Sequence, residues 1–460
     1  MNTCDRNQTI VSDPQGSKQG GEVPTQSESK DYLSWTERSV WSISMLRALV
    51  IGVKGEKWYS LIDKVYRGEN LKAAFKAVKR NKGAPGLDRQ SVGRFGNDLD
   101  RQLERLHREL KEDRYQPKPA LRKWIEKPGS KEQRPLGIPT VRDRVVEAAL
   151  KQVIEPIFER EFSDCSHGFR PGRSTKSALR EVDRSLRKEG YQIVVEVDIK
   201  GFFDHLSHEL LMKRVGEKVC DSRVLSLIES ILKRGVMEEG NLRVTASGVP
   251  QGGVISPLLA NIYLNELDHE LEANNHRVIR YADDLVVMCR SQSEADEVLE
   301  RLEKWMSANG LELHPEKTGV VNMTEKGNGI EFLGYRFERT RIKGRLAKWP
   351  SVKACKRLRQ RLKYYLRRTN RRGIEEIIGL INPILRGWYQ HFKNASGTSL
   401  QSIDEWVRMR LRSILRRNHK RRGRGRGKDH QRWPNRYFAS LGLFSLQTAK
   451  DEALQSLRQG

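Results

Sequence analysis

The sequence lacks the features that mark membrane, secreted or disulfide-stapled proteins. Its 460 residues contain no apolar run of about 18 residues, so no membrane-spanning helix is expected. The first six residues contain no apolar stretch of the kind that a secretory signal needs. The five cysteines lie far apart and form no Cys-x-x-Cys pair, which argues against a zinc ribbon and a disulfide scaffold. A reducing cytoplasm is therefore the expected compartment.

Acidic residues are also scarce beside the basic ones. The chain has 59 Asp and Glu against 86 Lys and Arg, which gives a net charge of +27. A chain this basic repels itself unless a polyanion neutralises it. The predicted partner is nucleic acid, and an anionic membrane surface is the weaker alternative. The excess is greatest from Arg408 to Lys428, which holds eleven Lys or Arg and no Asp or Glu.

The pattern of apolar residues divides the chain into three parts that follow a polar tail. Residues 1–34 contain few apolar residues and are predicted to be disordered. Apolar residues then recur at helical spacing, and from about residue 190 to 340 strands and helices alternate, as in an α+β sheet domain. After about residue 345 basic helices are predicted, over 351–368, 374–392 and 406–417.

An acidic pair stands between two apolar, β-rich runs. The runs predict the two strands of a tight hairpin with Asp283 and Asp284 at its turn. Taken alone, the pair is also typical of a structural turn, because Asp side chains bond nearby backbone groups. A third carboxylate, Asp198, ends the predicted strand Ile193–Asp198.

If these strands are neighbours, the three carboxylates meet at one edge of the sheet. Three ionised carboxylates need a cation, and Mg²⁺ prefers such oxygen ligands. Two ions about 4 Å apart clamp the attacking 3′-hydroxyl and the leaving pyrophosphate of nucleotidyl transfer. A strongly basic chain with this cluster is therefore predicted to be a nucleotidyl transferase.

Five motifs, in order along the chain, carry a family resemblance. Residues 281–284 resemble the Tyr-x-Asp-Asp box of reverse transcriptases, and 198–204 resemble the first catalytic block of these enzymes. Residues 248–261 resemble the block that holds the incoming nucleotide, and 134–140 and 167–174 complete the order. Together they make the chain similar to bacterial group II intron-encoded reverse transcriptases with maturase function. The resemblance covers about residues 35 to 445.

The resemblance implies an α+β fold, a right-hand polymerase with fingers and an Asp-bearing antiparallel palm sheet, followed by an α-helical thumb and X domain. The implied boundaries are 1–34 for the tail, 35–190 for the N-terminal extension and fingers, 191–345 for the palm, 346–425 for the thumb and maturase X domain, and 426–460 for a basic segment that is a DNA-binding remnant.

The family pattern also implies a set of catalytic and nucleotide-binding residues. Asp198, Asp283 and Asp284, with the backbone carbonyl of Ile199, would bind two Mg²⁺ ions, with Mn²⁺ as an alternative. Phe203 would block a ribose 2′-hydroxyl and select dNTPs; core packing is its alternative role. The other implied dNTP contacts are Lys127, Arg134, Gln251 and Lys317. A solvated basic edge is the alternative for Lys127 and Arg134, and a plain surface position on a strand over 311–320 is the alternative for Lys317.

Basic residues with interleaved aromatics suit contact with an RNA backbone and stacking on bases. The residues implied to bind intron RNA or template–primer duplex are Arg170, Arg173, Trp388, Tyr389, Arg408, Arg412 and Arg416. The expected partners are group II intron RNA in a ribonucleoprotein, a DNA primer or target, and dNTPs, with no membrane. A bacterial, nucleoid-associated cytoplasmic location is expected.

Two departures from the family pattern qualify the expected activity. No endonuclease motif follows the X domain, so the compact class is expected, which needs a pre-existing 3′ end as primer. Glu147 stands where a Gln is expected, and an acid there would weaken a template contact.

The predicted function is copying of intron RNA into DNA together with assistance to splicing and mobility. Two alternatives stay open. One is a binding-only maturase, an RNA chaperone whose polymerase is idle. The other is a group II-like cellular reverse transcriptase of repair or defence.

Overall fold

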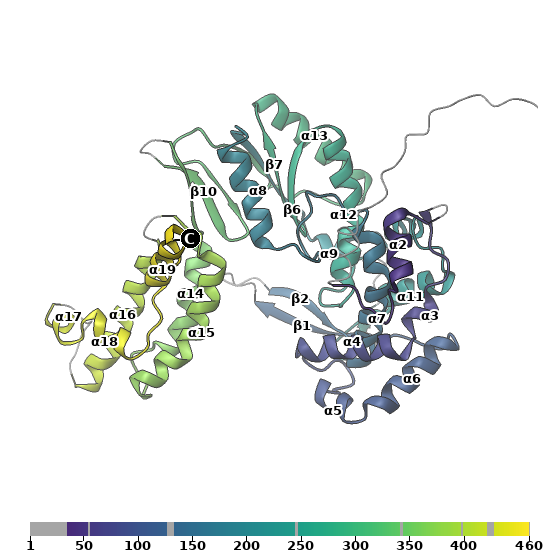
Figure 1. Ribbon diagram of the computed structural model, residues 1–460, viewed down its shortest axis with the longest axis horizontal. Helices are drawn as coiled ribbons and strands as arrows, with labels where there is room; N and C mark the ends of the chain where they lie inside the picture. Colours follow the sequence, from purple (N-terminus) through teal and green to yellow (C-terminus); the bar gives the residue numbers. More distant parts are fainter. Residues whose placement is uncertain are drawn as a thin grey trace, which may run out of the picture.

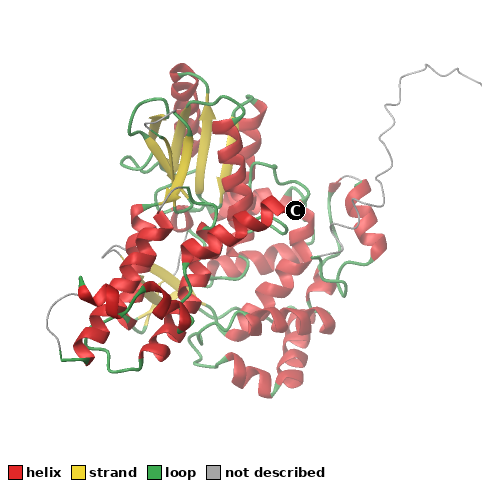
Figure 2. Cartoon of the chain, turned by 60° about the vertical axis from the view of Figure 1, so that its left-hand side comes forward, coloured by secondary structure: helices red, strands yellow, loops and turns green. Residues whose placement is uncertain are grey.

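The structure is a computed structural model, and it describes residues 35–53, 56–126, 133–243, 247–340, 344–396, 399–420 and 427–459. In Figure 1 the N-terminal helices lie below and to the right of β1 (Ala120–Glu126) and β2 (Gln133–Ile138), a second sheet with its helices stands above them, and the C-terminal helices lie at the left. Figure 2 shows the same arrangement by secondary structure, with most of the chain in helices. Among the described helices, none is long and apolar enough to cross a membrane.

The N-terminal part is a group of helices around one central helix, α7. The outer helices contribute apolar stripes, such as Leu103, Leu106 and Leu110 on α6. The central α7 (Val141–Glu159) begins at an N-cap, where the Thr140 hydroxyl accepts from the Asp143 amide, and it is buried along most of its length. The surrounding helices are α2 (Ile43–Ile51), α3 (Ile62–Val65), α4 (Gly68–Arg80), α5 (Val92–Asn97) and α6 (Leu99–Lys111).

The first sheet is a small one in the region predicted as fingers, with strand order β2-β1-β4-β5. Basic and apolar residues alternate over 118–139, which predicts a hairpin, and β1 and β2 form it with antiparallel pairing. Strand β4 adds to β1 in parallel. The predicted turn of the hairpin, with Lys127, lies outside the described residues. The strands are β1 (Ala120–Glu126), β2 (Gln133–Ile138), β4 (Val236–Glu238) and β5 (Asn241–Arg243).

The second sheet is antiparallel throughout, with order β6-β7-β3-β8. Its strands are β3 (Ile193–Asp198), β6 (Arg277–Tyr281), β7 (Asp284–Cys289) and β8 (Gly319–Asn322). Val195 and Val287 belong to one apolar core, and Val194 and Val286 belong to another. Since successive side chains of a strand point to opposite faces, the sheet has a core on each side.

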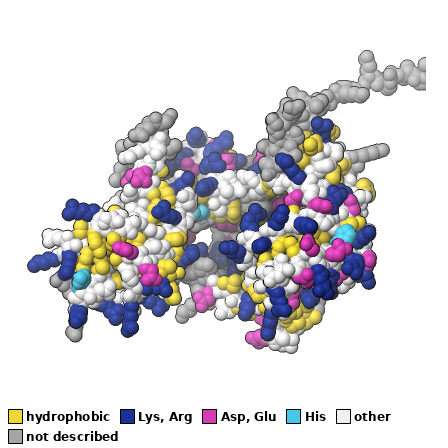
Figure 3. Space-filling view, turned by 60° about the horizontal axis from the view of Figure 1, so that its bottom comes forward, with side chains coloured by type: hydrophobic (Ala, Val, Ile, Leu, Met, Phe, Trp, Pro, Cys, Tyr) yellow, Lys and Arg dark blue, Asp and Glu magenta, His cyan; other side chains and the backbone are white. Residues whose placement is uncertain are grey.

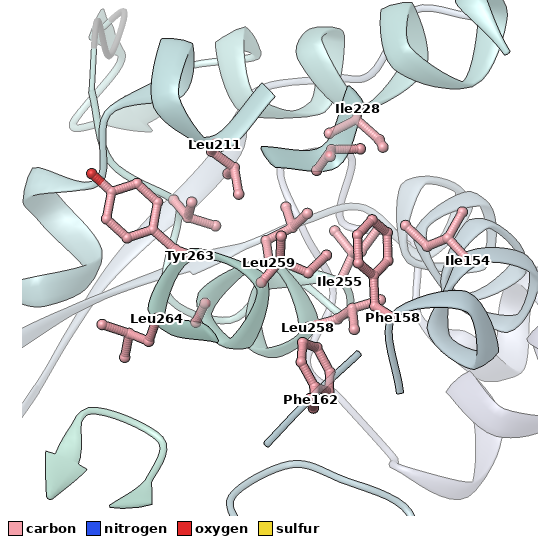
Figure 4. Close-up of a cluster of buried hydrophobic side chains, with 14 of the residues drawn as sticks. Ile154, Phe158, Phe162, Leu211, Ile228, Ile255, Leu258, Leu259, Tyr263 and Leu264 are labelled. Atoms are coloured by element: carbon pink, nitrogen blue, oxygen red, sulfur yellow. The ribbon is translucent and has the colours of Figure 1, made fainter. Parts of the chain in front are cut away.

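Helices connect the strands of this sheet, and several of them cover the face that carries Val195 and Val287. Figure 4 shows part of that core, with Phe158 of α7, Leu258 of α12 and Ile228 of α11 in one cluster. The helices of the region are α8 (Thr175–Arg187), α9 (Phe202–His205), α10 (His208–Gly216), α11 (Ser222–Lys233), α12 (Ser256–Ala273) and α13 (Gln292–Ala308).

Two predicted strands differ from the observed ones. The strand predicted over 311–320 is reduced to β8, which begins at Gly319, because Pro315 has no N–H to pair and Lys317 lies in a turn. The alternation of apolar and polar residues over 330–337 predicts a single strand, but the structure has a hairpin there. Leu333 and Gly334 have positive φ of 49° and 81°, as the two central residues of a type I′ hairpin turn require.

That hairpin belongs to a third sheet, with order β11-β10-β9, which leads into the C-terminal helices. Its strands are β9 (Gly329–Phe332), β10 (Tyr335–Arg339) and β11 (Leu346–Pro350). The helices are α14 (Val352–Tyr365), α15 (Ile374–Phe392), α16 (Ser399–Asn418), α17 (Lys428–Arg432), α18 (Asn435–Ser440) and α19 (Leu446–Gln459). Trp433 and Phe438 lie in the same core as α15 and α16, so this core crosses residue 426, where the sequence predicts a boundary.

Candidate active site

The pairing of β3 with β7 brings Asp198 and Asp284 together. Asp198 is the direct partner of Asp284 in the antiparallel register, and both residues lie on the same face of the sheet as Val194 and Val286. Side chains directly opposite each other in such a pair have Cβ atoms about 4.5–5.5 Å apart, and like charges there are destabilising. The register of the sheet therefore places two carboxylates that are 86 positions apart in the sequence next to each other at the end of the sheet.

The third carboxylate comes from the turn that joins β6 to β7. Tyr281 pairs with Asp284, so Ala282 and Asp283 form a two-residue hairpin turn. Ala282 has φ of 61°, a left-handed conformation that costs a residue with a Cβ of order 1–3 kcal/mol. The turn places Asp283 directly before the paired Asp284, and the charges of Asp283 and Asp198 both act on the Asp284 carboxyl.

The electrostatics of the three carboxylates are those of a crowded anionic site. Burial, followed by the charges of Asp283 and Asp198, raises the pKa of Asp284 to about 7. Burial and the charge of Asp198 also raise the pKa of Asp283. Both shifts disfavour the ionised forms, which a bound cation would favour.

The donor set fits a hard divalent cation. Lys317 Nζ lies 2.8 Å from Asp198 Oδ2 and offsets one negative charge, while Asp283 and Asp284 lie beside it. Among the described residues, no three His, Cys, Asp or Glu side chains stand close enough together to hold a metal ion without a change of rotamer. The site is nonetheless an all-oxygen cluster with more negative charge than one ammonium offsets, which is the chemistry that Mg²⁺ and Mn²⁺ take.

The first sheet contacts the glycine-rich loop over 248–253 beside the carboxylates. The Gly137 amide of β2 donates to the Gln251 carbonyl at 2.7 Å, and Arg134 Nε donates to Gln251 Oε1 at 3.0 Å. Arg134 is exposed and close enough to lower the pKa of Asp283. The structure thus brings Arg134 and Gln251 close to the end of the second sheet that carries Asp198, Asp283 and Asp284, which we call the catalytic corner. Lys127 lies outside the described residues.

The buried Glu147 side chain also holds the backbone that directly follows this loop. The Glu147 carboxylate is buried, forms an ion pair with the buried Arg234, and accepts from the Val254 amide at 2.5 Å and from the Ile255 amide at 3.4 Å. The expectation that an acid at 147 weakens a template contact is therefore wrong, because the side chain points into the protein and fixes the backbone that follows Gln251.

Comparisons with known proteins agree with this geometry. Residues 125–337 match the family model "Reverse transcriptase (RNA-dependent DNA polymerase)", and residues 355–433 match "Group II intron, maturase-specific domain". Protein YkfC of Escherichia coli K12 is 34% identical over 321 residues, which cover 61% of this chain and 83% of YkfC. The chain belongs to the group II intron reverse transcriptases.

Two further similar proteins are matched over a smaller share of their own length. The group II intron-encoded protein LtrA of Lactococcus lactis is 41% identical over 197 residues, 42% of this chain, but the match spans only 32% of LtrA. A solved structure of a partial Cas6-RT-Cas1–Cas2 complex is 26% identical and covers 56% of this chain and 43% of that one, with a TM-score of 0.36. By family, this chain is an RNA-directed DNA polymerase of a class that uses divalent metals, and its maturase domain implies an RNA partner.

Of the residues expected to bind RNA, three are buried in this reverse transcriptase. Arg170 is 7% exposed and bonds the Glu159 carboxylate and the Ser166 carbonyl, so it braces its own loop. Arg412 is 3% exposed and donates to the Trp433 carbonyl at 2.9 Å. Tyr389 is 6% exposed and packs edge-on against a phenylalanine of the C-terminal core. The predicted RNA contacts by these three side chains are wrong, because each is packed inside the protein.

The other predicted RNA contacts lie nearer the surface. Arg173 pairs with the exposed Asp164, Arg416 pairs with Asp429, and Arg408 is half-buried on α16. Trp388 lines a groove of 1140 Å³ between the 333–334 turn and helices α14 and α15, together with Arg361. Figure 3 shows a hollow between two lobes of the molecule, with Lys and Arg side chains on both.

The sequence reasoning passed over one residue of the catalytic corner, Arg280. It lies between Ile279 and Tyr281 in β6, is 0% exposed, and forms a buried ion pair with Asp268 of α12. Two signals could have found it. A charged residue interrupts an otherwise apolar strand, and Asn261 and Asp268 are seven positions apart, so they share a face of one helix.

Proposed function

We propose that the chain copies group II intron RNA into DNA with two Mg²⁺ ions held by Asp198, Asp283, Asp284 and the backbone carbonyl of Ile199. The observation that carries the proposal is the register of β3 against β7, which pairs Asp198 with Asp284 beside the Asp283 turn. When bound, the two ions would lower the pKa of the primer 3′-hydroxyl and neutralise the leaving pyrophosphate.

The residues around the cluster then have distinct tasks. Arg134, joined to Gln251, presents a guanidinium to the triphosphate. Lys127, which lies outside the described residues, is proposed as a second cation for the triphosphate. Lys317 neutralises Asp198 in the absence of nucleotide and is within reach of a triphosphate beside that carboxylate. Phe203 lies half-buried on α9, where its backbone carbonyl accepts from the Val249 amide of the nucleotide loop at 2.7 Å. In the proposal its ring closes the space that a ribose 2′-hydroxyl would need.

RNA binding is proposed for the basic C-terminal helices. The groove beside Trp388 is lined by α14 and α15, with Arg357 and Arg361 of α14 among its lining residues. Arginine and aromatic side chains at such a groove suit backbone contact and base stacking. Template–primer duplex and intron RNA would both engage these helices, with DNA supplying the primer 3′ end.

Primer extension on an RNA template tests the polymerase. Wild-type protein with dNTPs and Mg²⁺ should extend a DNA primer, and Asp283→Ala should abolish extension while intron RNA is bound with unchanged affinity. Asp296→Asn, on the exposed side of α13, is the matched control and should extend at the wild-type rate. Wild-type protein that binds the RNA but incorporates no dNTP would overturn the polymerase and favour the binding-only maturase.

A further inference from the structure

Arg280 makes four hydrogen bonds from a fully buried position directly behind the catalytic turn. Nε donates to Asp268 Oδ1 at 2.7 Å and Nη2 donates to Asp268 Oδ2 at 2.5 Å, so the two side chains form a bidentate ion pair. Nη1 donates to Asn261 Oδ1 at 3.0 Å and to the Ala282 carbonyl at 2.9 Å. The last bond reaches the residue before Asp283, so the guanidinium holds the peptide group that joins Ala282 to the catalytic carboxylate.

The same turn is held from its other side by the loop over 165–168. The His167 amide donates to the Arg280 carbonyl at 2.8 Å, and the Arg280 amide donates to the Cys165 carbonyl at 2.9 Å. Gly168 lies so close that a Cβ there would stand 2.3 Å from the Ala282 nitrogen. Asn261 Nδ2 donates to the Gly168 carbonyl at 2.8 Å, so Asn261 joins this loop to Arg280.

These contacts meet at the one residue of the turn with a left-handed backbone. Ala282 has φ of 61°, and the first position of a two-residue hairpin turn favours Gly, which has no Cβ. An Ala in that conformation persists only where the surroundings determine it. Arg280 on one side and Gly168 on the other supply those surroundings.

We propose that Arg280, fixed by Asp268 and Asn261, is a positioning residue that holds the Ala282–Asp283 peptide so that the Asp283 carboxylate meets Asp198 and Asp284 in the geometry of metal binding. The inference rests on the proposed function of these three carboxylates. It adds a buried connection from Asn261 and Asp268 of α12, the helix that follows the glycine-rich loop, through Arg280 to the turn that carries Asp283.

Lysine cannot replace this geometry. A guanidinium has five donors in a fixed plane and serves a carboxylate and two further acceptors at once, whereas an ammonium is a single point charge on a flexible stem. Arg280→Lys therefore keeps the positive charge beside Asp268 while it loosens the bond to the Ala282 carbonyl.

The test compares Arg280→Lys with Arg214→Lys. Arg214 is likewise buried, pairs with Glu266 of α12 and donates to the Tyr263 carbonyl at 2.6 Å, but it has no bond to the turn. In primer extension, Arg280→Lys should lower kcat about 10²-fold with an unchanged KM for dTTP, because a catalytic group misplaced by about 1 Å costs that much. Arg214→Lys should keep the wild-type kcat.

A second readout does not depend on activity. Calorimetric titration with Mn²⁺ in the absence of nucleotide should show an affinity about 10–100-fold weaker for Arg280→Lys than for wild type, since groups that orient metal ligands have effects of that size. RNA affinity should be unchanged. If Arg280→Lys does not fold, Asn261→Ala leaves the Arg280–Asp268 pair intact, and it should lower kcat and Mn²⁺ affinity in the same direction.

The outcomes separate the two proposals. An inactive wild-type enzyme that binds no Mn²⁺ would contradict the proposed function itself. An active wild type with folded Arg280→Lys and Asn261→Ala at wild-type kcat and Mn²⁺ affinity would overturn the positioning role alone. Equal losses in Arg280→Lys and Arg214→Lys would also overturn it, because buried arginines would then act only through stability.

Discussion

The catalytic corner of the palm and the C-terminal helices carry charge in different ways. In the palm, strand register and a two-residue turn determine where Asp198, Asp283 and Asp284 stand, and all three meet at one end of a sheet. On α16, Arg408 and Arg412 are one helical turn apart, yet the first is half-buried and the second is 3% exposed. A motif in a strand and turn thus locates its side chains, whereas a basic helix does not tell which of its arginines face outward.

The difference follows from what covers each element. Pairing partners in a sheet are set by the strands themselves, because a slip by one residue would turn every side chain to the wrong face. The outward side of a helix depends on the next element to pack against it. Arg412 is covered because α17 and α18 lie over the end of α16, where Arg412 Nη2 also donates to Asn435 Oδ1 at 2.8 Å.

The largest expected effect is at the catalytic corner. Asp198→Asn should lower the rate of primer extension by about 10³-fold or more, because removal of a residue that acts only as part of a catalytic unit has effects of that size. Binding of intron RNA, measured by filter retention, should not change. A parallel loss of RNA affinity would mean that the two regions are not separate in function.

On α16, Arg412→Ala should affect folding rather than binding. It removes one buried and one partly buried hydrogen bond and leaves a cavity, so the free energy of unfolding should fall by about 2–4 kcal/mol. Arg408→Ala is the matched variant one turn away, and its effect on stability should be within about 0.5 kcal/mol while RNA affinity falls several-fold. Urea denaturation and filter binding of both variants measure the contrast. Equal stability of the two would contradict the structural role of Arg412.

Nucleotide selection gives a third, smaller effect. Phe203→Ala should raise the incorporation of rNTPs relative to dNTPs by about 10–100-fold, the usual range for one pocket contact. Phe203→Tyr keeps the ring and should discriminate as the wild type does. Competition of dTTP with UTP in single-nucleotide extension measures the ratio of rNTP to dNTP incorporation. An unchanged ratio in Phe203→Ala would mean that the ring only packs in the core and does not select the sugar.

The raised pKa of Asp284 predicts a graded effect of pH. Because its pKa of about 7 in the folded, metal-free protein exceeds the ordinary 3.8, this carboxyl stabilises the fold at low pH, and that contribution is lost as pH rises from about 4 through 7. Asp284→Asn removes this loss, so its melting temperature relative to wild type should be higher at pH 8 than at pH 5. The Mg²⁺ concentration for half-maximal rate of the wild type should rise below pH 7, since metal must displace the proton. A flat difference in melting temperature would contradict the shifted pKa.

Much of the fold follows from periodicity alone. The predicted bounds of β3 and of α15 are those of the structure, because each is a strong apolar pattern with clear ends. The predicted strands over 311–320 and 330–337 are wrong where local backbone chemistry overrides the pattern, at Pro315 in the first and at the two-residue turn Leu333–Gly334 in the second.

The candidate site was predictable only in part, for the same physical reason. The three aspartates lie in motifs whose local geometry is set by their own strands. Arg280, Asp268 and Glu147 have their roles through partners that come from other elements, which no local pattern shows. Arg170 and Tyr389 were misjudged because their burial depends on loops and helices that fold over them.

The second and third sheets share one apolar core with the C-terminal helices, and this has a practical consequence for anyone who wishes to divide the protein. Tyr335 of β10 donates its hydroxyl to the His391 carbonyl of α15 at 2.7 Å, and the Ser351 amide bonds the Gly334 carbonyl. A polymerase fragment truncated before α14 would leave Phe332, Tyr335 and Phe337 against water, so it should precipitate rather than work as a minimal enzyme. The strands β9 and β10 and the C-terminal helices are in this sense one folding unit, so removal of the helices endangers the part of the chain that matches the reverse transcriptase family.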